Sequence, residues 1–169
     1  MNHPLNLRRF YQAYSQFAEV KFIVLHRSLV ETIASHPGFD GGHPEGHLNV
    51  VAGYMLLIRQ FLDELPPDAW ALVCMKHLTD KYHDEVDGTA RQEVISRIAH
   101  FLGYPNDTCE DCFDGWRDTK KVHPPEEDLI RIARHLGDYN IMEKIDAVAK
   151  ELGGIWPPPV NNGPQCELY

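Results

Sequence analysis

The chain has 169 residues, the size of a single domain, and its hydrophobic fraction of 43% and charged fraction of 24% are ordinary for a soluble globular protein. The net charge of −9 disfavours nucleic acid or an anionic membrane surface as a partner. No apolar run of about 18 residues occurs, so we expect no transmembrane helix, and the N-terminal segment lacks the apolar core of a signal peptide. The compartment is therefore unknown, with the cytoplasm as the default expectation.

The first predicted element is an amphipathic helix over residues 6–17, because apolar side chains recur there with helical spacing. Residues 20–25 then form a short apolar run rich in β-branched side chains, which indicates a buried strand. The Ser-x-x-Glu pattern from Ser28 to Glu31 is a capping box, which predicts a helix over residues 28–35. The chain is thus expected to pass from strand to helix within a few residues.

Arg27 lies at this junction of strand and helix. A helix N-terminus offers free backbone N–H groups and the positive end of the helix dipole, so an arginine beside it favours a phosphate or sulfate site. Residues 1–35 are also the least acidic part of the chain, which places anion binding there. The simpler alternative is an ordinary surface ion pair for Arg27, and Ser28 is interpreted as a helix cap rather than a ligand.

The middle of the chain predicts a loop, a long helix and a second strand. Glycine and proline make residues 36–47 an expected loop. Apolar side chains on one face predict a strong helix over residues 51–65, which Pro66 and Pro67 end. Residues 70–75 then indicate a second buried strand.

Three further helices are predicted in the second half. A second capping box at Thr89 opens a helix for which Gly103 is the expected C-cap. Residues 104–125 are irregular and polar. Acidic residues at the end of that segment start another helix, which a short glycine-containing break separates from a last helix over residues 141–152.

This alternation of helices and strands points to an α/β fold with parallel strands. Only two strands are convincing, and such a thin sheet indicates either a small domain or one with a missing piece. We expect one domain over residues 1–155, followed by a tail over residues 156–169. Because the tail is rich in proline and glycine, we expect it to lie over the surface or to fray, with its WPPP segment packing on its own domain rather than on another chain.

Two groups of motifs occur in a fixed order along the chain. The first apolar strand ends beside Arg27, and Ser35 follows eight positions later. Further on, WALVCMKHL precedes TARQEVISRIAHFLG, which ends in Phe101-Leu102-Gly103. This order resembles the sulfotransferases that use 3′-phosphoadenosine-5′-phosphosulfate (PAPS), in which a strand ends in Arg, a Ser follows eight positions later, and a second strand leads to a helix ending in F-L-G. The resemblance covers residues 4–105.

The resemblance implies a partial three-layer, parallel-sheet fold of the P-loop-like sulfotransferase type, rich in helices. It implies a transferase that moves a sulfuryl group from PAPS to a hydroxyl or amine on a carbohydrate or small molecule, with no metal expected. By resemblance, Arg27 and Ser35 hold the 3′-phosphate of the cofactor, and Lys120 and Lys121 belong to the basic loop that closes this site, where the alternative is a solvated loop. His3 is the candidate general base.

The chain also departs from the family. No Lys-Ser-Gly-Thr-like turn, which in the family holds the 5′-phosphosulfate, occurs in the sequence. Lys76-His77-Leu78 stands where the family has an E-D-L-like segment, and Asn6 has a better spacing to Arg27 than His3 does. The chain therefore resembles the C-terminal part of a sulfotransferase. The alternative function is a non-catalytic helical interaction protein on a degenerate sulfotransferase scaffold.

Cys109 and Cys112 form a C-x-x-C pair, the most metal-like feature of the sequence. A structural zinc site needs four ligands, so His43, His47 or His123 would have to complete it. A zinc-stabilised binding module is therefore a third hypothesis, whereas a reversible disulfide or two reduced thiols is the favoured interpretation.

The other two cysteines are interpreted separately. Cys74 lies in an apolar run and is interpreted as a small core residue. Cys166 is interpreted as free or as part of a disordered tail, because four cysteines are too few for a disulfide scaffold at this chain length.

Overall fold

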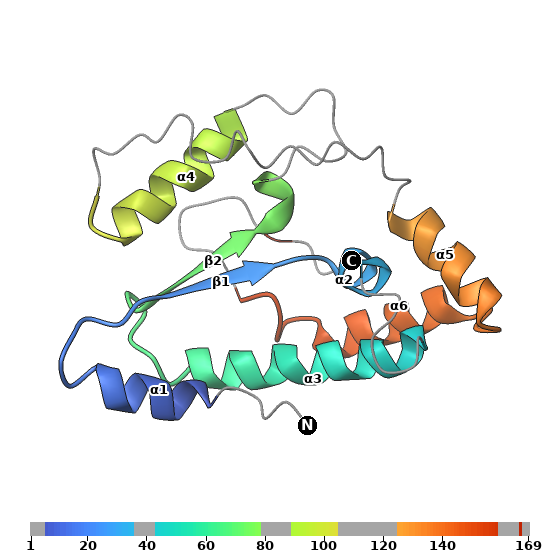
Figure 1. The fold of residues 1–169 in the computed structure, drawn as a ribbon, viewed down its shortest axis with the longest axis horizontal. Helices are drawn as coiled ribbons and strands as arrows, with labels where there is room; N and C mark the ends of the chain where they lie inside the picture. Colours follow the sequence, from blue (N-terminus) through green and yellow to red (C-terminus); the bar gives the residue numbers. More distant parts are fainter. Residues whose placement is uncertain (1–5, 36–42, 79–88, 105–124, 159–165, 167–169) are drawn as a thin grey trace.

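The computed structural model describes residues 6–35, 43–78, 89–104, 125–158 and 166. Its centre is a two-stranded parallel sheet of β1 (Phe22–His26) and β2 (Trp70–Cys74) (Figure 1). A 3₁₀ turn (Met75–His77) follows β2. The helices are α1 (Leu7–Tyr14), α2 (Leu29–Ala34), α3 (Pro44–Leu62), α4 (Thr89–Phe101), α5 (Pro125–His135) and α6 (Ile141–Leu152).

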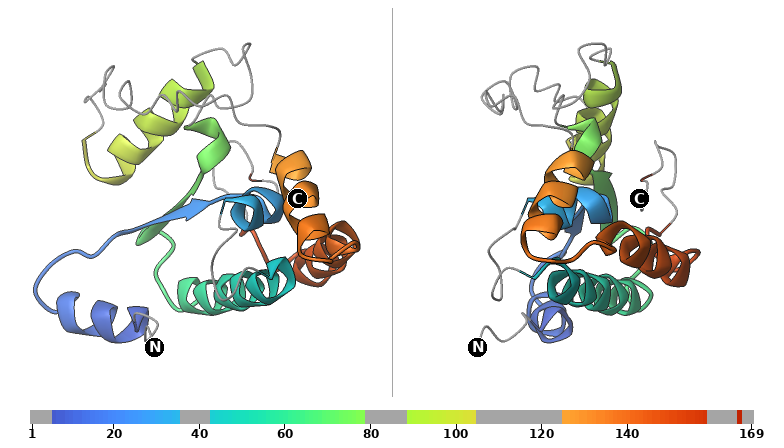
Figure 2. Two further views of the ribbon diagram at one scale, coloured as in Figure 1. Left: turned by 45° about the vertical axis from the view of Figure 1, so that its right-hand side comes forward. Right: turned by 90° about the vertical axis from the view of Figure 1, so that its right-hand side faces the viewer.

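The predicted α/β class with parallel strands is confirmed in this helix-rich form. Helices lie on both sides of the small sheet (Figure 2). On one side, Phe22 of β1 packs edge-on against Phe61 of α3, with ring centroids 5.1 Å apart. On the other side, fully buried Val73 of β2 packs in a cluster with Val94 of α4. α6 packs along α3, and α5 packs against α2. α2, which comes directly after β1 in the chain, therefore belongs to the larger of the two hydrophobic clusters.

α1 ends at Tyr14, earlier than the predicted helix over residues 6–17. The side chain of Asn6 caps its first turn by accepting a hydrogen bond from the backbone N–H of Arg9 at 3.0 Å. Phe17, which the helical spacing had placed on the apolar face, is 85% exposed. An aromatic side chain without a core to enter adds nothing to the last turn, so the helix ends before it.

α3 corrects the last part of the expected loop over residues 36–47, of which residues 36–42 lie outside the described part of the chain. The helix begins at Pro44, because proline at the first helical position lacks only an N–H that would have no intrahelical partner there. Gly46 weakens this first turn by about 1 kcal/mol relative to alanine. Burial of Pro44 and of Leu48, which is 1% exposed, offsets that cost. No described helix is both long and apolar enough to cross a membrane.

α4 ends where the sequence predicts. Gly103 has a φ of 89°, a conformation that glycine adopts without a side-chain clash. The N–H of Gly103 bonds to the carbonyl of His100 at 3.0 Å, and that of Tyr104 to the carbonyl of Ala99 at 2.8 Å. This pair of bonds is a Schellman motif, so Gly103 terminates the helix as expected.

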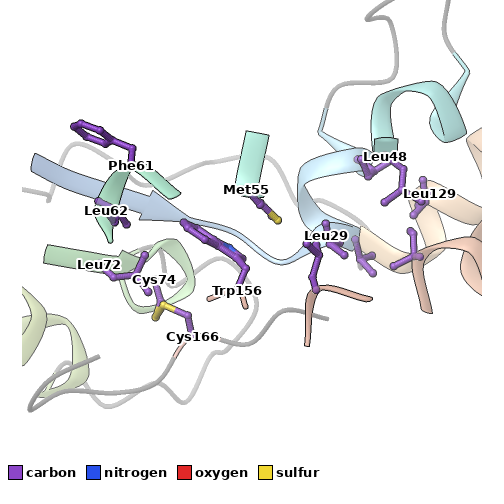
Figure 3. Close-up of a cluster of buried hydrophobic side chains, with 14 of the residues drawn as sticks. Leu29, Leu48, Met55, Phe61, Leu62, Leu72, Cys74, Leu129, Trp156 and Cys166 are labelled. Carbon is purple, nitrogen blue, oxygen red and sulfur yellow. A yellow bond between two sulfur atoms is a disulfide. The ribbon is translucent and has the colours of Figure 1, made fainter. Parts of the chain in front are cut away.

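The expectation that the tail lies over the surface or frays is wrong for its described residues. Trp156 is 3% exposed and belongs to the main hydrophobic cluster (Figure 3). Pro158 is fully buried, and Cys166 is 8% exposed. Trp156 and Pro158 pack on their own domain, as predicted for the WPPP segment, because a large indole adds more buried apolar area than most core residues.

Candidate functional site

The candidate site lies where the two parallel strands end. His26, the last residue of β1, is the register partner of Cys74, the last residue of β2, so both carboxyl ends lie at the same edge of the sheet. Ligands of open α/β sheets bind outside this edge. Arg27 follows His26 directly and is half-buried. The structure therefore places the predicted anion-binding arginine at the edge where a ligand is expected.

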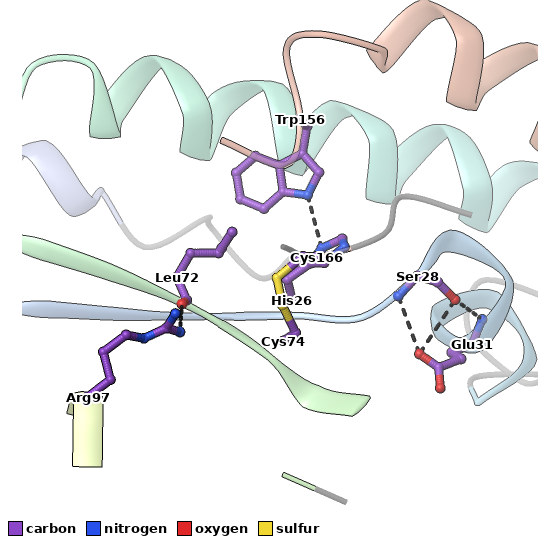
Figure 4. Close-up of a disulfide and its surroundings, with 8 residues drawn as sticks. All are labelled: His26, Ser28, Glu31, Leu72, Cys74, Arg97, Trp156 and Cys166. Carbon is purple, nitrogen blue, oxygen red and sulfur yellow. Dashed lines mark hydrogen bonds between the residues drawn. A yellow bond between two sulfur atoms is a disulfide. The ribbon is translucent and has the colours of Figure 1, made fainter. Parts of the chain in front are cut away.

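α2 begins with the predicted capping box. The Oγ atom of Ser28 accepts a hydrogen bond from the Glu31 backbone N–H at 3.2 Å, and Glu31 Oε2 accepts one from the Ser28 backbone N–H at 3.4 Å (Figure 4). Ser28 is thus a cap, as interpreted from the sequence. The same bonds fix the carboxylate of Glu31 at the N-terminal end of the helix, one turn after Arg27.

Arg27 and Ser35 lie at opposite ends of α2, separated by roughly 10 Å of helical rise. Ser35 is the C-cap, and its Oγ donates a hydrogen bond to the Thr32 carbonyl at 3.0 Å. Arg27 forms no hydrogen bond or ion pair with any described residue, which argues against the surface ion pair considered for it. The two side chains flank the helix and do not meet directly.

Two of the three other described cations near the N-terminus have partners. Lys21 Nζ donates to the Phe101 carbonyl at the end of α4 at 2.7 Å and lies 3.1 Å from Glu19 Oε1. Arg8 pairs with Glu64, and this contact raises the pKa of Arg8 and lowers that of the Glu64 carboxyl. Half of the positive charge near residues 1–35 is therefore engaged in contacts, and Arg9 and Arg27 have no side-chain partner among the described residues; of these two, Arg9 is exposed on α1, whereas Arg27 lies at the end of β1.

The sequence reasoning missed a double attachment at this edge of the sheet. The indole N–H of Trp156 donates to His26 Nδ1 at 3.0 Å, and Cys74 forms a disulfide with Cys166 (Figure 4). Both attachments come from the C-terminal segment and meet neighbouring strand ends. The prediction of Cys74 as a core residue is confirmed by its burial, whereas the interpretation of Cys166 as free is wrong, because the two cysteines are bonded to each other.

One sequence signal was available for this attachment. A tryptophan followed by prolines is a poor component for a solvated tail, because the indole gains by burial only if its N–H finds a partner. His26 supplies that partner while itself being 3% exposed. The cysteine pairing had no such signal, since pairing among four cysteines does not follow from spacing.

Several predicted site residues lie outside the described part of the chain: His3, Cys109, Cys112, Lys120, Lys121 and His123. His43 is described as the N-cap of α3, and His47 lies in the first turns of that helix. Among the described residues, no cluster of three or more His, Cys, Asp or Glu side chains has an arrangement suited to a metal ion.

Comparison with protein-family models, with curated proteins and with solved structures finds no match for this chain in any of the three. Function therefore has to be argued from the residues themselves.

Proposed function

We propose that this protein is sulfotransferase-like and binds PAPS through its 3′-phosphate, for sulfuryl transfer to a hydroxyl or amine acceptor on a carbohydrate or small molecule. The observation that carries the proposal is Arg27, an unengaged arginine at the carboxyl edge of a parallel sheet. A guanidinium fits phosphate oxygens with two parallel hydrogen bonds, which gives such a site both affinity and orientation.

Ser35 would be the second anchor of the 3′-phosphate. A phosphate group between Arg27 and Ser35 would lie along α2, and the hydroxyl of Ser35 would donate to it in place of its bond to the Thr32 carbonyl. Glu31 lies between these two residues on the helix. Its carboxylate is held at the backbone of Ser28, near Arg27, so the attraction between the guanidinium and a phosphate would have to outweigh the repulsion from this carboxylate.

The second half of the proposed scaffold is supported by α4. This helix ends in Phe101-Leu102-Gly103 and packs beside β2. Lys21, at the start of β1, donates to the carbonyl of Phe101 at 2.7 Å, so the end of α4 is joined to the strand that leads to Arg27. The order of strand, arginine, second strand and F-L-G helix is thus a spatial unit as well as a sequence pattern.

Anchoring a remote phosphate orients the cofactor but stabilises no transition-state charge by itself. Transfer also needs a base at the acceptor and cationic donors to the sulfuryl oxygens. We propose His3 for the base, and Lys120 and Lys121 as the basic loop that completes the 3′-phosphate site.

A non-catalytic binding protein on the same scaffold is the second candidate. One observation favours it: Trp156 and the Cys74–Cys166 disulfide already occupy the strand ends beside Arg27. A site covered in this way still accommodates a phosphate at Arg27, but it leaves less room for an acceptor. Nucleotide binding without sulfuryl transfer to a panel of hydroxyl and amine acceptors would support this second candidate.

Calorimetric titration with 3′-phosphoadenosine-5′-phosphate tests the binding proposal. Arg27→Ala should weaken binding at least tenfold, which corresponds to about 1.4 kcal/mol. Arg9→Ala is the matched control, because Arg9 is exposed on α1 and its loss removes the same charge from the same part of the chain. Binding that is absent in the wild-type protein, or equally weakened by both substitutions, would overturn the proposal.

A further inference from the structure

The outer edge of β1 carries unpaired backbone groups. The N–H of Phe22 bonds to the carbonyl of Ala69 at 2.8 Å, and the strands pair in parallel register. Backbone polar groups of alternate residues point to opposite edges, so Phe22 and Val24 face β2 while Ile23 and Leu25 face outward. Within the described chain, the outward N–H and C=O groups of Ile23 and Leu25 have no hydrogen-bond partner.

The outer edge of β2 is partly occupied by a side chain of α4. Leu72 has its polar groups on that edge, and its carbonyl accepts a hydrogen bond from Arg97 Nη2 of α4 at 2.7 Å (Figure 4). Burial against the strand lowers the pKa of Arg97, with the Glu93 carboxylate acting in the opposite direction. Cys74, at the end of the strand, is held by its disulfide. The two edges of the sheet therefore differ in part, because Arg97 occupies the Leu72 carbonyl on the β2 edge, whereas no described group bonds to the outward backbone groups of Ile23 and Leu25 on the β1 edge.

The face beside this edge is apolar and is not covered by any described helix. Ile23 is 40% and Leu25 is 56% exposed, whereas Val73, on the same face over β2, is fully buried beneath α4. Natural edge strands are usually blunted by proline, lysine, a bulge or a covering element. The sequence of β1, FIVLH, contains neither proline nor lysine. An edge of this kind pairs readily with another extended segment.

We propose that β1 pairs with β1 of a second copy of this chain, antiparallel and about a two-fold axis at Ile23. In this register Ile23 lies opposite Ile23 of the second copy, and Leu25 lies opposite its Lys21. Glu19, whose side chain is 78% exposed and lies 3.1 Å from Lys21 Nζ of its own chain, then lies opposite Arg27 of the second copy, and the symmetry repeats this contact at the other end. The negative charge at one end of the β1 edge thus meets the positive charge at the other end of the same edge in the second copy. Pairing of the two copies would therefore compete with a phosphate for the Arg27 guanidinium.

The neighbouring register is unfavourable. A two-fold axis at Val24 would place Lys21 opposite Arg27 of the second copy, and two like charges directly opposite each other destabilise a strand pair. It would also align the residues whose polar groups already bond to β2. A two-fold axis at Leu25, which would use the same outward backbone groups, would place Arg27 opposite Ile23 and form no ion pair. The charge pattern therefore favours the register centred on Ile23.

This pairing would convert two marginal two-stranded sheets into one sheet with four strands, β2–β1–β1–β2. Three or more strands with an apolar face give a sheet independent stability, whereas an isolated pair is marginal. Ile23 and Leu25 of both copies would form one continuous apolar strip on the uncovered face. The net charge of −9 on each copy opposes association at low ionic strength, so the interaction is best measured at physiological salt.

A site-specific cross-link tests the register. Directly opposed residues of a hydrogen-bonded antiparallel pair have Cα atoms about 5.5 Å apart, a distance that a disulfide spans. Ile23→Cys should therefore form a disulfide-linked dimer on mild oxidation, seen on a non-reducing gel. Leu25→Cys, which is more exposed than Ile23 but lies opposite Lys21, is the matched control and should remain unlinked, as should the wild-type chain.

Light scattering coupled to size exclusion measures the association itself. At chain concentrations up to about 0.5 mM, where a submillimolar Kd is visible, the mass should rise from 19.4 kDa toward twice that value. Glu19→Arg should weaken the dimer about tenfold, and the double variant Glu19→Arg/Arg27→Glu should restore it, since two exposed ion pairs are inverted and then re-formed. A chain that stays monomeric, a dimer that Ile23→Cys does not cross-link, or efficient cross-linking of Leu25→Cys would each overturn the proposal.

Discussion

Removal of the Cys74–Cys166 disulfide should strongly destabilise the fold. The double variant Cys74→Ala/Cys166→Ala eliminates the bond without leaving an unpaired buried thiol. Both sulfur-bearing side chains lie in the main hydrophobic cluster, where Cys74 is 2% and Cys166 is 8% exposed. Alanine keeps most of that burial, so the measured loss belongs mainly to the cross-link itself.

The size of the loss follows from the length of chain that the bond encloses. The two cysteines are 92 positions apart. Closing a loop of that length lowers the entropy of the unfolded chain by an amount worth about 4.6 kcal/mol at 25 °C, and native disulfides contribute about 2–5 kcal/mol when measured. For a chain of this size, a loss of about 4 kcal/mol corresponds to a fall in Tm of roughly 10 °C.

Urea unfolding followed by circular dichroism measures this change through the midpoint. The matched control is Cys109→Ala/Cys112→Ala, which removes the same number of cysteines and leaves the 74–166 bond intact. Mass spectrometry of a non-reduced digest should yield a peptide pair containing Cys74 and Cys166. A midpoint of Cys74→Ala/Cys166→Ala equal to that of the wild type, or free thiols at both positions, would refute the reasoning.

Two further changes probe contacts of the described structure. Trp156→Phe should lower the free energy of unfolding by about 1–3 kcal/mol, because His26 Nδ1 loses the indole donor in a buried site. The control Trp70→Phe, at a half-buried indole, should cost less. Equal losses in urea titration would speak against the role of the Trp156–His26 hydrogen bond. Arg8→Ala should return the lowered pKa of Glu64 toward its ordinary value in an NMR titration. The pKa of Glu64 is lower in the folded than in the unfolded chain, so this exposed pair contributes to stability above the unfolded pKa, and the contribution is lost as the pH falls through the folded pKa. A Glu64 pKa that Arg8→Ala leaves unchanged would exclude Arg8 as the cause of the lowered value.

The elements around Arg27 could be predicted because local physics determines them. A capping box that involves only Ser28 and Glu31 starts α2, and a glycine with positive φ at position 103 ends α4. The parallel arrangement of two short apolar runs follows from the helices between them. These signals lie within a few residues of one another, so sequence reading recovers them.

Features that depend on distant residues were not recoverable. Nothing near Cys74 indicates Cys166 as its partner, and nothing near His26 indicates Trp156, because each contact joins segments far apart in the chain. The early start of α3 was missed for a related reason. The glycines around Pro44 favour a loop locally, and the burial of Leu48 in the assembled core outweighs that preference.

The candidate site also combines features that the sequence predicts with features that only the structure shows. The spacing of Arg27 and Ser35 is a sequence feature, but their position at opposite ends of a six-residue helix, with the Glu31 carboxylate turned toward the N-cap, is visible only in the structure. His3, Lys120 and Lys121 remain predictions from resemblance. The lack of any partner for the Arg27 guanidinium within the described chain is the observation that most strengthens the anion-site hypothesis.

Comparison of two nucleotides on the wild-type protein tests the central claim most directly. Calorimetric titrations with 3′-phosphoadenosine-5′-phosphate and with adenosine 5′-phosphate differ only in the 3′-phosphate that Arg27 is proposed to bind. We predict that the 3′-phosphate strengthens binding at least tenfold, about 1.4 kcal/mol, and that Arg27→Ala removes this difference. Equal Kd values for the two nucleotides, or a difference that persists in Arg27→Ala, would contradict the account.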